Sequence, residues 1–171
     1  TMCEILADLG VHVHWQDDET LTLCSGELTY KQPHRDLCEK IRASILFLGP
    51  MLGRFGKVNL PLPGGDVIGA RRIDTHFESI ETLGGIVELK EGEIAAHIDK
   101  IVGTALYLDE PSVTATENAL LLSVLGEGTT KIYNAACEPH VVGLCRLLNA
   151  MGASIKGVGS NCLEIKGVTS L

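Results

Sequence analysis

Three pieces of sequence decide the fold: the stretch Leu144-Cys145-Arg146-Leu147-Leu148-Asn149-Ala150-Met151-Gly152 and, after it, the short runs Ala153-Ser154-Ile155 and Leu163-Glu164-Ile165. Apolar residues recur three and four positions apart up to Gly152, which is the period of a helix that a glycine ends. The two runs flank a polar turn at Gly159-Ser160-Asn161, as the strands of a hairpin do. The stretch therefore predicts a helix, a glycine stop, a strand, a turn and a strand.

The same unit occurs twice earlier in the chain. The first copy comprises Met2–Gly10, Val11-His12-Val13, a turn at Asp17-Asp18-Glu19, and Leu21-Thr22-Leu23. The second comprises His76–Gly84, Ile86-Val87, a turn at Lys90-Glu91-Gly92-Glu93, and Ile94–Ile98. Copies spaced by roughly 70 residues indicate a repeat architecture.

A second unit alternates with the first. Ala43–Phe55 and Thr116–Leu125 are nearly all-apolar helical stretches, and they lead to predicted strands at Lys57–Leu60 and Thr130–Tyr133. A helix that is apolar on every side must be buried on every side. We therefore predict an α/β repeat fold with the helices inside and the sheets outside.

Composition limits the class of protein. The 171 residues are enough for one domain with a core, and the net charge of −8 argues against nucleic acid or an anionic membrane surface as a partner. No apolar run is long enough to span a bilayer, and no stretch resembles a signal peptide. The six cysteines lack a Cys-x-x-Cys spacing and stand among apolar residues, so we expect reduced core thiols in a cytoplasmic protein rather than a disulfide framework. Because the chain begins at Thr1 and directly with a predicted helix, we expect it to be part of a longer protein.

The segment from Pro61 to His76 carries the residues best suited to chemistry. It combines glycines and prolines with Asp66, Arg71, Arg72 and an Asp-x-His sequence, so it is predicted to be a loop. The planar guanidinium of arginine pairs with phosphate or carboxylate at two points. The loop therefore indicates anion binding, with Asp66 as a candidate proton donor.

Several segments, in order and spacing, resemble the UDP-N-acetylglucosamine enolpyruvyl transferase (1-carboxyvinyltransferase) family of the EPSP synthase-like superfamily. They are Arg42-Ala43-Ser44-Ile45, Leu48-Gly49-Pro50, Leu62-Pro63-Gly64-Gly65-Asp66-x-Ile68-Gly69-Ala70-Arg71, Ile73-Asp74-x-His76, Pro111-Ser112-Val113-x-Ala115-Thr116-Glu117-Asn118, Glu127-Gly128-Thr129-Thr130 and Asn134-Ala135-Ala136-x-Glu138-Pro139. The resemblance implies βαβαββ units around a three-fold axis, helices inside and sheets outside. It implies one domain over residues 1–171, with a truncated first unit at about 1–30, and second and third units, both whole, at about 41–99 and 104–167.

The resemblance also implies a reaction. Members transfer the enolpyruvyl group of phosphoenolpyruvate to the 3-hydroxyl of UDP-N-acetylglucosamine and release phosphate, the first committed step of peptidoglycan synthesis. No metal or organic cofactor is implied. The family's site lies between two domains, so the second domain is an implied partner and we expect this chain to be inactive alone. Two alternatives stay open: the sister transferase that acts on shikimate 3-phosphate, and a nucleotide-sugar-binding or structural domain without catalysis.

In the family, the residue that matches Asp66 protonates the methylene carbon of phosphoenolpyruvate and is most often cysteine, in a subset aspartate. An unperturbed aspartate has a pKa of about 3.9 and a cysteine about 8.5, so Asp66 would need a raised pKa to donate a proton at neutral pH. Fosfomycin alkylates the cysteine, and a carboxylate is expected to resist it. Without the flanking motif, Asp66 would be interpreted as a turn residue.

The remaining implied roles concern substrate binding. Arg71 is implied to bind phosphate, and the substrate cleft is implied to include Arg42, Arg72, Ile73, Asp74, Thr75, His76, Ser112, Val113 and Glu138. Six of these residues have a structural alternative: a solvated loop arginine for Arg71, an ion pair for Arg42, helix caps for Asp74 and Ser112, a core histidine for His76 and a helix-start residue for Glu138.

The chain departs from the family's pattern at four positions in or beside the matching segments. Arg72 stands where proline is usual, Glu110 where many members have a lysine near the diphosphate, Thr114 replaces a glycine and Cys137 replaces an arginine. Glu110 and Cys137 each remove a positive charge, whereas Arg72 adds one. Among the properties that the resemblance implies, nucleotide binding is therefore the one that these substitutions affect most.

Overall fold

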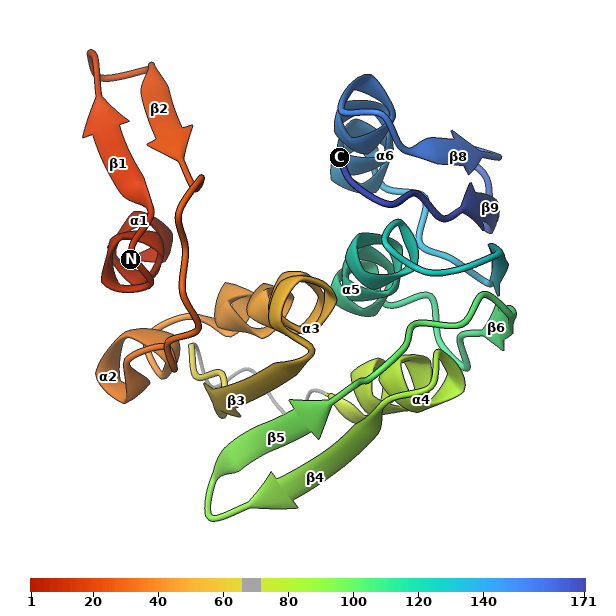
Figure 1. The fold of residues 1–171 in the computed structure, drawn as a ribbon, viewed down its shortest axis with the longest axis horizontal. Coiled ribbons are helices and arrows are strands. Elements are labelled where there is room, and N and C mark those ends of the chain that lie inside the picture. Colours follow the sequence, from red (N-terminus) through yellow and green to blue (C-terminus); the bar gives the residue numbers. More distant parts are fainter. Residues whose placement is uncertain (66–71) are drawn as a thin grey trace.

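Helices and hairpins alternate along the chain in the computed structural model, which describes residues 1–65 and 72–171 (Figure 1). In chain order the elements are α1 (Met2–Asp8), β1 (His12–Trp15), β2 (Leu21–Cys24), α2 (Arg35–Cys38), the 3₁₀ helix η1 (Arg42–Phe47), α3 (Leu48–Phe55), β3 (Lys57–Pro61), α4 (Asp74–Thr82), β4 (Ile86–Lys90), β5 (Glu93–His97), β6 (Ala105–Tyr107), α5 (Val113–Ser123), β7 (Thr129–Tyr133), α6 (Pro139–Ala150), β8 (Ser154–Lys156) and β9 (Cys162–Lys166).

The strands of the described residues form three sheets, with the orders β1-β2, β3-β5-β4 and β6-β7-β9-β8. Neighbouring strands are antiparallel except β6 and β7, which are parallel. In the second sheet Val58 lies opposite Ala96, which lies opposite Val87, so apolar residues share one face. The predicted hairpins are therefore confirmed, and the turns that join them are the polar segments identified in the sequence.

Each copy of the repeated helix ends at a glycine with positive φ. The values are 96° at Gly10, 103° at Gly84 and 107° at Gly152. After each glycine the backbone N–H of the next residue returns to a carbonyl five positions back, as from Val11 to Leu6 and from Ala153 to Leu148. This hydrogen-bond pattern closes the last turn of a helix and favours glycine, because other residues rarely adopt positive φ. The helix of each repeat therefore ends with the same backbone conformation and the same hydrogen bond.

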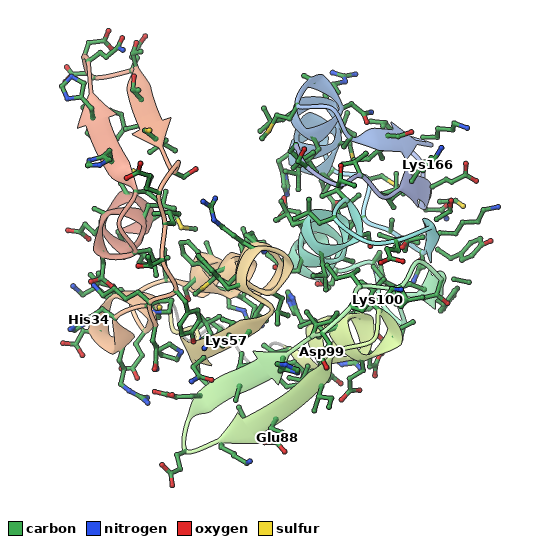
Figure 2. The ribbon with its side chains drawn as sticks, viewed as in Figure 1. His34, Lys57, Glu88, Asp99, Lys100 and Lys166 are labelled. Atoms are coloured by element: carbon green, nitrogen blue, oxygen red, sulfur yellow. The ribbon has the colours of Figure 1, made fainter. Side chains whose placement is uncertain are left out.

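The helices α3, α4 and α5 lie in the middle of the molecule, and the three hairpins lie at its periphery (Figure 1). Residues of α5 are buried on nearly all sides, including the apolar Ala115, Leu120 and Leu122. Charged side chains such as Glu88 and Lys166 lie on the outer strands (Figure 2). The prediction of inner helices and outer sheets is confirmed.

Two apolar clusters fill the space between helices and sheets. One joins α3 and α4 to the sheet of β3, β4 and β5, and the other joins α5 and α6 to the sheet of β6 to β9. The hairpin β1–β2 extends from this core, and its Trp15 and Leu23 side chains are 54% and 49% exposed. Among the described residues no helix is both long and apolar enough to cross a membrane.

Four details differ from the sequence predictions. The stretch 43–55 is not one α-helix but η1 followed by α3, because Pro50 lacks an N–H and its ring would clash with the carbonyl of Leu46 in a continuous helix. Residues 25–41 are all described and contain no strand, so the second unit lacks the opening strand that β6 supplies to the third. Helix α5 begins at Val113, three residues before the predicted Thr116, because Ser112 caps it.

The fourth difference concerns cysteine. All six cysteines belong to the described residues and are free thiols, but only Cys38 and Cys145 are buried. Cys24, Cys137 and Cys162 are exposed, so the prediction of core thiols was wrong for them. Cys24 and Cys162 occupy strands, where side chains alternate between faces, and an apolar neighbour in sequence therefore does not imply burial.

Candidate functional site

Most of the predicted site residues that the structure describes lie where η1, α4 and α5 begin. Arg42 opens η1, Ile73 precedes α4, and Ser112 precedes α5. The predicted proton donor Asp66 and the predicted phosphate ligand Arg71 lie outside the described residues. The structure therefore defines the two ends of the segment 66–71 and the groups around them.

The first end is fixed to the helix α2. The backbone N–H of Gly64 donates to the carbonyl of Cys38 at 3.3 Å, and that of Gly65 donates to the carbonyl of Glu39 at 3.2 Å. A Cβ atom at position 64 would lie 1.6 Å from the carbonyl oxygen of Glu39, so this approach requires glycine. The Pro-Gly-Gly sequence thus docks the loop on the end of α2.

The second end is fixed by two arginines. Nη2 of Arg42 donates to the backbone oxygen of Arg72 at 2.8 Å. The guanidinium of Arg72 donates to both carboxylate oxygens of Asp74, at 2.7 to 3.1 Å, and Nη2 also lies 2.5 Å from the carboxylate of Asp109. Hydrogen bonding to Arg72 lowers the pKa of Asp74. Asp74 was predicted as the N-cap of α4, but the cap position is Ile73 and the carboxylate of Asp74 instead binds Arg72.

Asp109, which the sequence analysis did not identify, links this end of the loop to the connection between β6 and α5. Besides Arg72 it accepts a hydrogen bond from Oγ1 of Thr75, at 3.3 Å. Thr75 is buried at the start of α4. The sequence signal for Asp109 was the acidic run Asp109-Glu110-Pro111 before a helix start. The contact of Asp109 with Arg72, however, depends on how the repeat units pack.

His76 belongs to a buried network. The Oδ1 atom of Asn118 accepts from the N–H of Gly49 at 2.8 Å, and its Nδ2 donates to the carbonyl of Ile45 at 2.9 Å. These two bonds fix the amide orientation, so Nδ2 also donates to Nδ1 of His76, 3.0 Å away. His76 then carries its proton on Nε2, which lies 3.2 Å from Oγ1 of Thr114.

The environment of His76 favours the neutral ring. Burial, reinforced by the positive charge of Arg42, lowers its pKa to about 4. Both ring nitrogens have partners from α5 or its first turn, and the side chain is 1% exposed. These contacts support the structural alternative for His76, in which it joins α4 to α5.

Ser112 acts as the cap of α5. Its Oγ accepts from the N–H of Ala115 at 3.4 Å, and its carbonyl accepts from Oγ1 of Thr116 at 2.7 Å. Thr116 in turn accepts from the N–H of Ala136 at 3.0 Å, which ties α5 to the segment before α6. The capping alternative for Ser112 is thus confirmed, while Val113 is the first residue of the helix and half-buried.

Glu138 lies at a different helix start. It occupies the cap position of α6, where its side chain makes no capping hydrogen bond. Its negative charge disfavours the charged form of Glu117. Burial first, and Glu138 to a lesser extent, raise the pKa of Glu117, while His140 opposes them. Among the described residues no group of three or more His, Cys, Asp or Glu side chains is arranged to hold a metal ion.

The arrangement defines a class of protein: an α/β repeat domain in which the two ends of a glycine-rich segment are fixed, one to the end of α2 and the other at the start of α4. The sequence matches the family model described as EPSP synthase (3-phosphoshikimate 1-carboxyvinyltransferase) over residues 1–171. The chain belongs to this family.

Curated relatives share more specific names. A UDP-N-acetylglucosamine 1-carboxyvinyltransferase of Borrelia garinii is 49% identical over 168 residues, which are 98% of this chain and 39% of the relative. The protein of the same name from Treponema pallidum is 57% identical over 136 residues, or 80% of this chain and 32% of the relative. The chain therefore spans well under half the length of these relatives.

Solved structures show the same fold. The enolpyruvyl transferase NikO from Streptomyces tendae has a TM-score of 0.81 at 22% identity, covering 96% of this chain and 39% of that one. EPSP synthase from Acinetobacter baumannii has a TM-score of 0.70 at 17% identity, covering 99% of this chain and 39% of that one. At these identities the likeness concerns the fold alone.

Proposed function

We propose that the whole protein to which this chain belongs is a UDP-N-acetylglucosamine 1-carboxyvinyltransferase. The observation that carries the proposal is the similarity to relatives of that name over 98% of the chain. The reaction transfers an enolpyruvyl group from phosphoenolpyruvate to the 3-hydroxyl of the sugar. It would contribute to peptidoglycan synthesis.

The chemistry proceeds by addition and elimination. The sugar hydroxyl oxygen forms a bond to C2 of phosphoenolpyruvate and gives its proton to an aspartate base that we propose in the second domain, while C3 gains a proton from Asp66. The intermediate then loses a C3 proton and the C2–O bond to phosphate breaks, which restores the double bond and releases phosphate. Asp66 must enter this cycle protonated, so nearby substrate anions are proposed to raise its pKa.

The positive groups have proposed roles around that acid. Arg71 binds the phosphate of phosphoenolpyruvate, and Arg42 lines the cleft while holding the backbone of Arg72. Segments 73–76 and 112–113 contact the nucleotide sugar, Arg72 lies beside them, and Glu138 lies at the edge of the cleft. We propose no metal and no organic cofactor for this reaction.

The second domain of the whole protein is the proposed partner of this chain. Because the chain spans 39% of the Borrelia relative, we propose that its isolated form binds substrate weakly and does not release phosphate. Measurable phosphate release by the isolated chain would contradict this. The free thiols are compatible with a cytoplasmic location, which we also propose.

Transfer to shikimate 3-phosphate is the second candidate function, because the matching family model carries that description. The decisive experiment measures phosphate release from phosphoenolpyruvate by the full-length protein with each acceptor in parallel. We expect release with UDP-N-acetylglucosamine and its loss in Asp66→Asn. Release only with shikimate 3-phosphate would assign the sister activity, and release with neither would indicate a non-catalytic binding domain.

A further inference from the structure

Arg72 connects two parts of the chain that are distant in sequence. Its guanidinium contacts the carboxylate of Asp74 at the start of α4 and the carboxylate of Asp109 in the β6–α5 connection. The three side chains form one cluster with a single cation between two anions. The backbone oxygen of Arg72 is held at the same time by Arg42.

The cluster lies at the surface, where a lone ion pair contributes little to stability. The side chains of Arg72, Asp74 and Asp109 are 45%, 53% and 39% exposed. Single exposed pairs are typically weak, whereas two-point contacts of arginine with carboxylates and linked pairs are better defined. We therefore expect the cluster to fix the local backbone geometry and the local electrostatic potential rather than to stabilise the fold.

We propose that Arg72 is a positioning residue that holds Asp74 and Asp109 together, fixes the start of α4 to the β6–α5 connection, and so sets the affinity for the anionic nucleotide substrate. The proposal rests on the proposed function and extends it. Without Arg72, two carboxylates would face each other at the edge of the site, repelling one another and an incoming diphosphate.

The location of Arg72 makes the effect specific to binding. Arg72 directly follows the segment 66–71 in sequence. Its contacts lie at the starts of α4 and α5, where Thr75 and Ser112, two other predicted substrate-binding residues, also lie. An interaction that is equally strong in the bound substrate and the transition state changes KM and leaves kcat nearly constant. The proposed role therefore predicts a KM effect.

The test uses the full-length protein and measures steady-state phosphate release while UDP-N-acetylglucosamine is varied. We expect Arg72→Ala to raise KM about tenfold with kcat changed less than about threefold, and Arg72→Lys to recover part of the loss because it restores the charge. Removing the second carboxylate as well, in Arg72→Ala with Asp109→Asn, is expected to bring KM back to within about threefold of wild type.

Arg146, an exposed arginine of α6, provides the matched control, and Arg146→Ala is expected to leave both constants unchanged. Melting temperatures of Arg72→Ala and Arg146→Ala are expected to stay within about 2 °C of wild type. A normal KM in Arg72→Ala would overturn the inference alone, if wild type is active. If the double variant keeps the raised KM of Arg72→Ala, repulsion between the carboxylates of Asp74 and Asp109 is not the cause of the effect, and the positioning role is overturned. An inactive wild type would remove the proposed function together with this inference.

Discussion

The side-chain amide of Asn118 donates a hydrogen bond to Nδ1 of His76 across 3.0 Å, and this contact joins helix α5 to helix α4. The same amide bonds the backbone of Gly49 and Ile45, so one side chain connects α5 with α3, η1 and α4. Asn118 is 2% exposed. The inner helices are therefore held together by one buried polar network rather than by apolar packing alone.

Replacing Asn118 by alanine is expected to destabilise the fold strongly. It would leave the N–H of Gly49, the carbonyl of Ile45 and Nδ1 of His76 without their partner, and each unsatisfied buried group costs roughly 1 kcal/mol or more. We expect a loss of about 3 kcal/mol in the free energy of unfolding, measured by urea denaturation. Asn161→Ala, at an exposed turn, is the control and should cost less than about 0.5 kcal/mol.

Stability should also depend on pH through His76. Its pKa is about 4 in the folded chain and 6.5 ordinarily, so between these values the unfolded state binds a proton that the folded state does not. The stabilisation is complete above pH 6.5 and is lost as the pH falls toward 4, by a total of about 3 kcal/mol. Denaturation curves from pH 4 to 7 should show this slope reduced in His76→Gln and retained in His14→Gln, whose histidine is exposed. Equal slopes in the two variants would argue against a buried neutral His76.

The elements were predictable because their signals are local. Apolar spacing and the glycine stops at Gly10, Gly84 and Gly152 determine helix, turn and strand without reference to the rest of the chain. The 3₁₀ start of the helix at 42–47 also had a local signal in Pro50, since a proline there is incompatible with a continuous α-helix.

The site was less predictable because its contacts depend on packing. The pairing of Arg72 with Asp109 joins two exposed charges from different repeat units, and in sequence each resembles a solvated surface residue. Asn118 did carry a signal, because an amide inside an apolar helix must find hydrogen-bond partners when buried. Its partners, however, come from three other elements, and only the arrangement of the helices identifies them.

Gly49, in the segment Leu48-Gly49-Pro50, is a position where glycine is required for a steric reason. A Cβ atom there would lie 2.7 Å from the backbone oxygen of Asn118, so α3 and α5 could not approach as they do. We expect Gly49→Ala to destabilise the fold by about 2 kcal/mol, because the crowded atom is backbone and cannot move alone. Gly143→Ala is the matched control in α6, where a Cβ meets nothing within 4 Å. It should stabilise by roughly 0.5 kcal/mol, since alanine is the better helix former. The two variants should thus shift thermal unfolding in opposite directions, and shifts of the same sign would refute the close contact.

The identity of the residue at position 66 should determine the response to fosfomycin. That compound alkylates a cysteine in the family's loop, and a carboxylate is a far weaker nucleophile than a thiolate at neutral pH. We expect the full-length wild-type protein to keep its phosphate release after incubation with fosfomycin, and Asp66→Cys to be active and progressively inactivated. A cysteine ordinarily has a pKa of about 8.5, so the variant is protonated at neutral pH and able to replace the acid. Mass spectrometry should find the adduct on Cys at this position and leave the exposed Cys137 and Cys162 unmodified, which provides an internal control. Inactivation of the wild type at the same rate would show that the drug acts at another residue and that position 66 does not occupy the proposed catalytic place.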